Sequence, residues 1–242
     1  GSRRTGLQGG AAGGGVCQAG SNETSGGGGE STIRVGNTQP LSGPYAGGGE
    51  NNITSGRATV ELWSEEMDAE IETFERDTEA DPTTGSRAAR ELIQEEDVHL
   101  VTGSYSSAVA LAINQVAQQQ GVPYITTPGS QAFSGADCTR YGFGSNPTTN
   151  ATTRAIATYA MENLGNSFYT MTHNYTAGTE GTAKAEQVIN DGGGSIEGNS
   201  LIDLGQSDMS SAITSAIDSG ADIMLTNVFA GDLATLLSQA RE

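Results

Sequence analysis

Residues 33–50, IRVGNTQPLSGPYAGGGE, decide the fold class of this chain. A short apolar strand pattern, IRVGN, runs directly into a loop of Gly, Pro and Ser, and a helical pattern starts at residue 50. In alternating α/β chains, the loop that leaves the carboxyl end of a strand is where ligands are held. The stretch therefore predicts an α/β fold with a binding loop that contains Tyr45.

From residue 33 onward the sequence alternates strand and helix patterns. The first block has expected strands at 33–37, 71–76, 98–102 and 122–126, and expected helices at 50–67, 83–96 and 107–120. After an irregular stretch at 128–147, the second block has expected helices at 149–163, 178–191, 209–219 and from 232, and expected strands at 168–171, 195–201 and 223–226. This order implies parallel sheets that are covered by helices on both faces.

Two α/β blocks predict two lobes, at 33–145 and 146–242. The chain stops inside its last expected helix, which leaves the second lobe incomplete. We therefore expect an amino-terminal fragment that is short by on the order of 100 residues, judged by the usual size of a domain.

Residues 1–32 have the pattern of an export segment followed by a Gly-rich tether. Two arginines, Arg3 and Arg4, precede a run of small residues that ends at Cys17, and this is similar to a twin-arginine signal with a lipoprotein cysteine. A disordered Gly-rich leader is the alternative. No apolar run approaches the roughly 20 residues that span a bilayer. We therefore expect an extracellular protein that is held to the membrane by a lipid on Cys17.

The charge of the chain excludes some classes of partner. The net charge is −18, from 29 acidic and 11 basic residues, and Lys184 is the single lysine. Binding of nucleic acid or anionic membranes needs clustered Lys and Arg, so neither is expected as a partner. An acidic, lysine-poor, folded chain resembles proteins adapted to molar salt, where charge repulsion is screened within about 3 Å.

Three loops of the first block lie at the carboxyl ends of expected strands, at 38–49, 103–107 and 127–130. These ends share one edge of a parallel sheet, so the loops are expected to meet in one crevice. The second loop places Ser106 and Ser107 at the start of a helix. Unpaired backbone N–H groups and the positive end of the helix dipole make such a position suitable for a carboxylate.

The segments PLSGPYAGGGE, GSYSSAVALA and GVPYITTPGS have an order and spacing that resemble the type I periplasmic solute-binding proteins. Members of this family serve ABC transporters for branched-chain amino acids, amides and urea. The resemblance implies that Ser107 and the loop of Pro128, Gly129 and Ser130 hold the carboxylate of the ligand. Helix capping and turn formation are the alternative roles of these residues.

The resemblance is weaker in the second block. The matching segment NYTAG, at 174–178, has Ala177 where the family has an aromatic residue. Tyr175, or Phe229 after the strand at 223–226, is expected to take this role. Packing in the core is the alternative for both residues, and Trp63 is assigned to the core.

The sequence gives little support to an enzymatic function. The two histidines, His99 and His173, have no acid placed to orient them, and Ser106 and Ser107 do not lie in a G-x-S-x-G motif. No metal-ligand spacing and no phosphate-loop motif occurs. We expect neither catalysis nor a metal or other cofactor.

Together these features predict a substrate-binding protein of an ABC importer that captures a small amino acid or an amide- or urea-like solute by hinge closure. Its expected partners are that ligand and a membrane permease, and it is expected to be a monomer. The alternatives are a ligand-sensing domain of a signalling receptor, or an α/β enzyme domain whose catalytic residues lie beyond residue 242.

Overall fold

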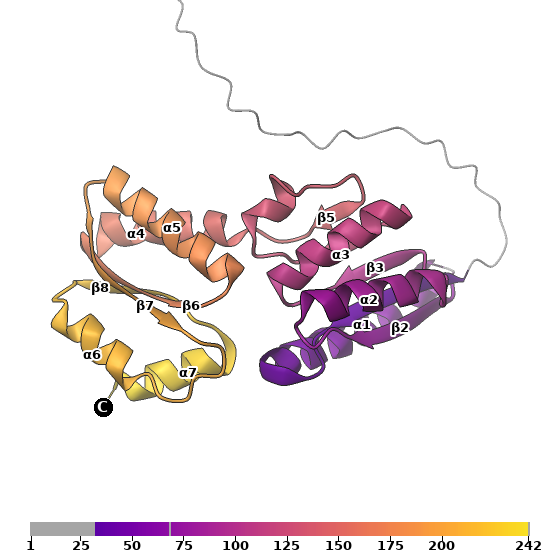
Figure 1. Ribbon diagram of the computed structural model, residues 1–242, viewed down its shortest axis with the longest axis horizontal. Coiled ribbons are helices and arrows are strands. Elements are labelled where there is room, and N and C mark those ends of the chain that lie inside the picture. The colour runs from indigo at the N-terminus through magenta and orange to yellow at the C-terminus, as the bar shows by residue number, and fades with distance from the viewer. Residues whose placement is uncertain (1–31, 68, 242) are drawn as a thin grey trace, which may run out of the picture.

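The computed structural model describes residues 32–67 and 69–241. In this part of the chain two α/β lobes lie side by side (Figure 1). Cys17 and the expected export segment lie outside the described residues. The domain limits given above stay a prediction.

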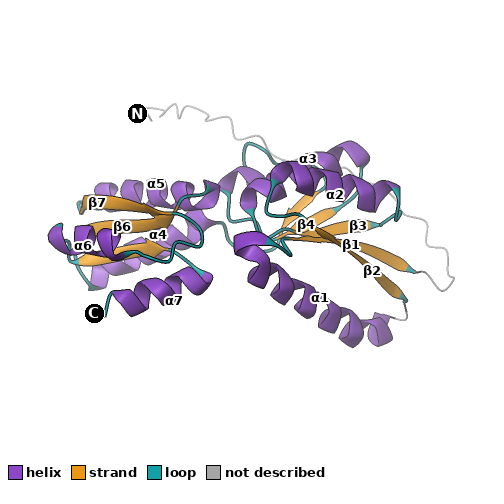
Figure 2. Ribbon diagram, turned by 60° about the horizontal axis from the view of Figure 1, so that its bottom comes forward, coloured by secondary structure: helices purple, strands orange, loops and turns teal. Residues whose placement is uncertain are grey.

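The first lobe is built on a five-stranded parallel sheet with the strand order β2-β1-β3-β4-β5. Its strands are β1 (Ile33–Gln39), β2 (Ile71–Asp77), β3 (Leu100–Gly103), β4 (Tyr124–Thr126) and β5 (Gly142–Gly144). Its longer helices are α1 (Ala46–Met67), α2 (Pro82–Gln94) and α3 (Ser107–Gln120). Helix α1 lies on one face of the sheet and α2 and α3 lie on the other (Figure 2).

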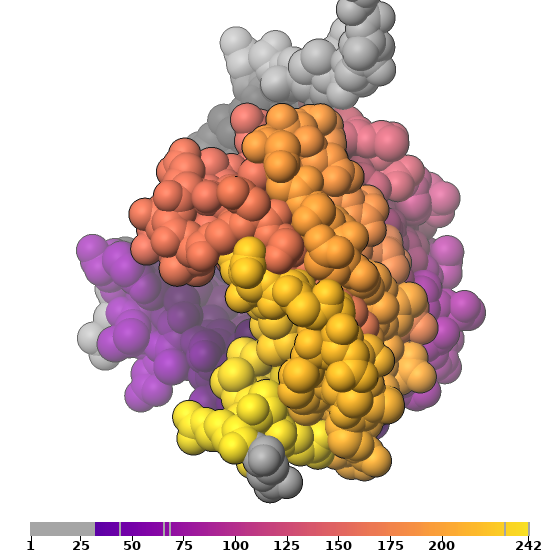
Figure 3. Space-filling view, turned by 90° about the vertical axis from the view of Figure 1, so that its left-hand side faces the viewer, coloured from indigo at the N-terminus to yellow at the C-terminus, as the bar shows by residue number. Residues whose placement is uncertain are grey.

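The second lobe has a three-stranded parallel sheet with the order β7-β6-β8. Its elements are α4 (Thr149–Asn163), β6 (Ser167–His173), α5 (Thr176–Asp191), β7 (Ser195–Ile202), α6 (Ser210–Asp218), β8 (Ile223–Asn227) and α7 (Ala230–Gln239). Helices α4 and α5 cover one face, and α6 and α7 cover the other (Figure 1). Figure 3 views this lobe from its outer end, with α4 and α5 above the yellow α7.

Local chemistry explains where several helices begin and end. Asp81 caps α2, because its carboxylate accepts a hydrogen bond from the Thr84 N–H at 2.8 Å, and Pro82 occupies the first turn. Helix α3 ends at Gly121, whose φ of 72° lies in the left-handed region that favours glycine. Helix α1 begins at Ala46, four residues before the expected start. Its first turn contains Gly47, Gly48 and Gly49, and the low helix propensity of glycine is the reason that the sequence does not predict this turn.

Each lobe has its own apolar core. In the first lobe, Leu92 of α2, Val101 of β3 and Ile113 of α3 are fully buried in one cluster. In the second lobe, Phe168 and Met171 of β6 belong to two clusters, one under α4 and α5 and one under α6 and α7. The central strand of a covered parallel sheet is buried on both faces, and the pattern of β6 fits this rule.

Two further sequence-based assignments differ from the structure. The stretch at 128–147 contains the short helix η2 (Gln131–Ser134) and strand β5, whose GFG sequence carries a single side chain large enough to show a pattern. Trp63 is wrongly assigned to the core, since half of its surface is exposed. It lies ten residues after the buried Ile53, and at 3.6 residues per turn this places it about 80° around the helix from that residue.

Candidate functional site

The strand orders locate one crevice in each lobe. In the first lobe the chain runs from β1 to β2 on one side and then crosses to β3 on the other side of β1. In the second lobe it runs from β6 to β7 on one side and then crosses to β8 on the other side of β6. In open α/β sheets, ligands bind outside the carboxyl ends of the strands at such switch points. The loops that follow β1, β3, β6 and β8 therefore form the candidate site.

In the first lobe, the loops after β1 and β3 bring two tyrosine rings together. Tyr45 ends the short helix η1 (Gly43–Tyr45) and is only 7 % exposed. Its ring centroid lies 5.5 Å from that of Tyr105, which follows β3. Tyr45 is a predicted site residue, whereas sequence analysis does not propose Tyr105, although Tyr105 stands in the same GSYSS segment as the two serines.

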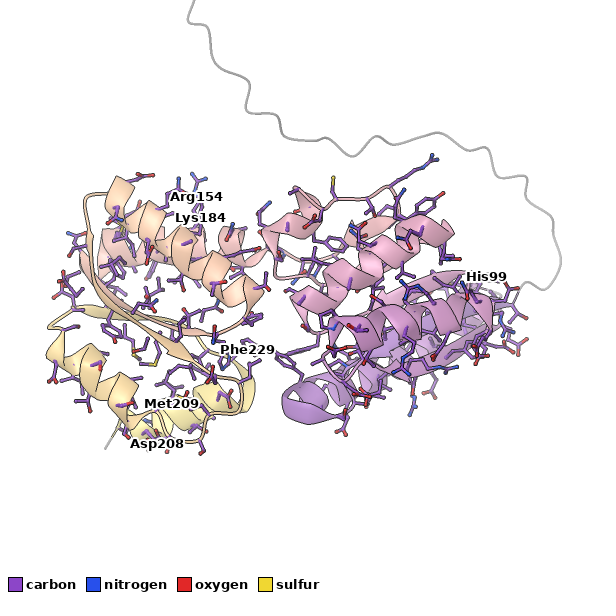
Figure 4. All side chains as sticks on the ribbon, viewed as in Figure 1. His99, Arg154, Lys184, Asp208, Met209 and Phe229 are labelled. Carbon is purple, nitrogen blue, oxygen red and sulfur yellow. The ribbon has the colours of Figure 1, made fainter. Side chains whose placement is uncertain are left out.

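Phe229 extends from the loop after β8 toward the first lobe (Figure 4). Its ring stacks against Tyr45 at a centroid distance of 6.2 Å and lies 6.2 Å from Tyr105. Within its own lobe it contacts Tyr175 at 5.7 Å and His173 at 4.5 Å. We call these five rings the aromatic cluster. Four of its members come from the four switch-point loops and His173 is the last residue of β6, so the cluster joins the carboxyl edges of the two sheets.

Two hydroxyl groups of the cluster, those of Tyr45 and Tyr175, have raised pKa values. Burial raises the pKa of Tyr175 to about 12, with smaller contributions from Tyr105 and Glu180. Burial, followed by the neighbouring Tyr175, Tyr105 and Asp232, also raises the pKa of Tyr45. Both phenols can therefore act as neutral hydrogen-bond donors at ordinary pH.

Ser107 lies in the first turn of α3 beside the loop that follows β4. The Gly129 N–H donates to Ser107 Oγ at 3.2 Å, so this oxygen is used as an acceptor and its hydrogen is left to donate. Ser106 occupies the N-cap position, but its side chain makes no capping bond. The capping alternative for Ser106 therefore finds no support in this geometry, and both serines stay candidates for ligand binding.

The loop after β4 is tied to both lobes. Pro128 is buried and packs near Gly144. The Gly129 carbonyl accepts a hydrogen bond from the Thr149 N–H at 2.8 Å. Ser130 is fully buried, and its hydroxyl donates to Glu180 of α5 at 2.7 Å. The assignment of this loop to the ligand stays a prediction, and sequence analysis does not foresee that the Glu180 carboxylate occupies the Ser130 hydroxyl.

His173 has an acidic partner, contrary to the sequence-based expectation. Its Nε2 lies 3.0 Å from Asp232 Oδ2 in α7, and the same carboxylate oxygen accepts from the Gly205 N–H at 2.9 Å. Burial lowers the pKa of His173 and outweighs the opposite effect of Asp232. The two residues are 59 positions apart, so no local pattern reveals the pair.

This pair does not form the centre of a catalytic triad in the described residues. The buried Nδ1 of His173 has no hydrogen-bond partner, and its ring neighbours are Phe229 and Tyr175. His99 accepts from the Arg34 N–H at 3.2 Å and lies away from Phe229 (Figure 4). Residues 32–67 and 69–241 also contain no group of three His, Cys, Asp or Glu side chains that could hold a metal ion.

Residues 32–242 match the model of the periplasmic binding protein family, and the chain belongs to that family. The Leu/Ile/Val-binding protein homolog 6 of Brucella abortus is 26% identical over 197 residues, which cover 78% of this chain and 49% of the relative. The chain thus spans about half the length of the curated relatives that it matches.

Solved structures have the same fold. A solute-binding protein of R. palustris in complex with benzoate is 24% identical, with a TM-score of 0.78 over 86% of this chain and 59% of that one. A leucine binding protein of Thermotoga maritima is 21% identical, with a TM-score of 0.73 over 86% of this chain and 60% of that one. These likenesses confirm the predicted α/β periplasmic-binding-protein fold. The relatives are binding proteins and not enzymes, as the sequence predicts.

Proposed function

We propose that this chain is the ligand-capturing part of an extracellular substrate-binding protein that delivers a small solute to an ABC permease. The main support for the proposal is the aromatic cluster. Its five rings come from both lobes and lie at the switch points of the two sheets. A solute held there contacts both lobes at once, so its binding favours the arrangement in which the lobes meet.

Ser107 is the group we assign to the polar end of the solute. The free hydroxyl hydrogen and the first N–H groups of α3 suit a carboxylate, and the half-buried ring of Phe229 suits an apolar side chain. We propose a small amino acid or an amide- or urea-like solute. The names of two relatives support an amino acid, since one is a Leu/Ile/Val-binding protein homolog and the other is a leucine binding protein. The benzoate complex of a structural neighbour adds aromatic acids to the solutes worth testing.

Isothermal titration calorimetry on the full-length protein tests the proposal. The panel comprises L-leucine, L-valine, urea, acetamide, benzoate and 4-hydroxybenzoate. We expect saturable binding of at least one of these solutes, and a loss of that binding when Tyr45 and Phe229 are both replaced by Ala. Binding that is unaffected by the double substitution refutes this location of the site.

The location of the protein outside the cell is part of the proposal. No helix of the described residues has the length and apolar character that a membrane crossing requires. We propose attachment through a lipid on Cys17. Mass spectrometry of the Cys17 peptide tests the anchor, since a peptide that lacks a lipid mass rules it out.

We also propose adaptation to high salt and a monomeric state with no nucleic-acid partner. The net charge of −18 supports all three, because like-charged surfaces repel one another, repel phosphates, and need counterions to fold compactly.

A further inference from the structure

Glu180 makes a direct polar connection between the two lobes. It belongs to α5, in the second lobe, and its carboxylate reaches the start of η2 in the first lobe. One oxygen accepts from Ser130 Oγ at 2.7 Å and the other accepts from the Gln131 N–H at 2.8 Å. Both oxygens are therefore used, and each is bonded to a different group of the first lobe.

The donors of this contact are held in place by their own lobe. Ser130 is fully buried, and its oxygen accepts from the Ala132 N–H at 3.1 Å. Its single hydrogen is then directed at Glu180. Hydrogen bonds to an ionised carboxylate are shorter and stronger than neutral ones, and the two distances fit this class.

Packing beside this contact brings the same two surfaces together. A Cβ atom placed on Gly129 would lie 3.0 Å from Ala177 Cβ in α5 and 2.9 Å from Thr149 Oγ1 in α4. The loop before Ser130 thus touches the second lobe closely, and the absence of a side chain at Gly129 permits this approach. The contact is made by other residues than those of the aromatic cluster, although the charge of Glu180 also acts on the nearby Tyr175.

We propose that Glu180 is a latch that holds the two lobes together independently of any bound solute. It does so by occupying Ser130 Oγ and the Gln131 N–H, which leaves Ser106 and Ser107 as the serine donors for a ligand carboxylate. The inference rests on the proposed function only in assuming that the lobes open and close. A latch of this kind raises the fraction of protein in the binding-competent arrangement, and the apparent affinity rises in proportion to that fraction.

Single-molecule fluorescence energy transfer on the full-length protein, without ligand, tests the latch. Dyes are attached at Leu62 of α1 and Ile217 of α6, which are both exposed, through unnatural amino acids that leave Cys138 intact. In Glu180→Ala we expect the ratio of closed to open molecules to fall about tenfold, the equivalent of about 1.4 kcal/mol. Glu180→Gln keeps an acceptor but loses the charge, so we expect a smaller fall.

Glu186→Ala is the matched control, because Glu186 lies on the same helix and is exposed. An open fraction in Glu180→Ala equal to that of Glu186→Ala overturns the proposal, and so does a wild-type protein that is mostly open. A second arm measures L-leucine and benzoate affinity. Tighter binding in Glu180→Ala would mean that Glu180 competes for carboxylate donors, and this also overturns the latch. Failure of all six solutes of the calorimetry panel to bind the wild type counts against the proposed function and leaves the fluorescence result intact.

Discussion

Replacing Ser107 by Ala has two separable effects in this geometry. In the free protein, the part-buried Gly129 N–H loses the acceptor that now lies 3.2 Å away. Leaving a buried donor without a partner costs about 1–3 kcal/mol, and for a chain of this size each kcal/mol lowers the melting temperature by roughly 2–4 °C. In the complex, the ligand carboxylate additionally loses the hydroxyl hydrogen. A hydrogen bond to a charged group contributes about 1.5–3 kcal/mol, so Kd should rise roughly tenfold to a hundredfold.

Calorimetry with matched acids and amides distinguishes the two effects. L-leucine is compared with L-leucinamide and benzoate with benzamide, in wild type, Ser107→Ala and the control Ser64→Ala, whose hydroxyl bonds to the Glu61 carbonyl on α1. We expect the Ser107→Ala loss for the acids and a much smaller loss for the amides, because the neutral amides lack the charge that strengthens the bond. An equal loss for acid and amide would assign Ser107 to loop structure alone, and unchanged affinity for the acids would remove it from the site.

Three further predictions follow from the same structure. Phe229→Ala removes two ring contacts with the first lobe, each contributing about 0.5–1.5 kcal/mol. L-leucine or benzoate should therefore bind about 5- to 150-fold more weakly. Phe143→Ala, at a half-exposed ring, is the control, and equal effects of the two substitutions on affinity argue against the cluster as the binding site. Burial lowers the pKa of His173, so the unfolded chain binds the proton more readily and stability should fall as the pH drops below about 6.5; His173→Gln should flatten this part of a denaturation–pH curve, and an equally steep curve contradicts the assignment. The melting temperature should rise between dilute and molar NaCl, because salt screens the repulsion within a chain of charge −18, and a temperature indifferent to salt refutes the halophilic hypothesis.

The order of strands and helices is readable in the sequence because it depends on local chemistry. The alternation of apolar runs with helical periodicity gives the parallel sheets, and a residue such as Gly121 marks a helix end through its own backbone preference. Since the carboxyl ends of parallel strands share an edge, the sequence also predicts that the loops containing Tyr45 and Ser107 lie together.

The contacts between distant residues are decided only by the tertiary structure. His173 and Asp232 are 59 residues apart, and Ser130 and Glu180 are 50 residues apart. Each pair depends on how separate elements pack and on how the lobes meet, and no spacing along the chain encodes either. From the sequence alone, a polar or charged side chain is predicted to be exposed to solvent. It acquires its hydrogen-bond partner only when folding brings a matching donor or acceptor within about 3 Å.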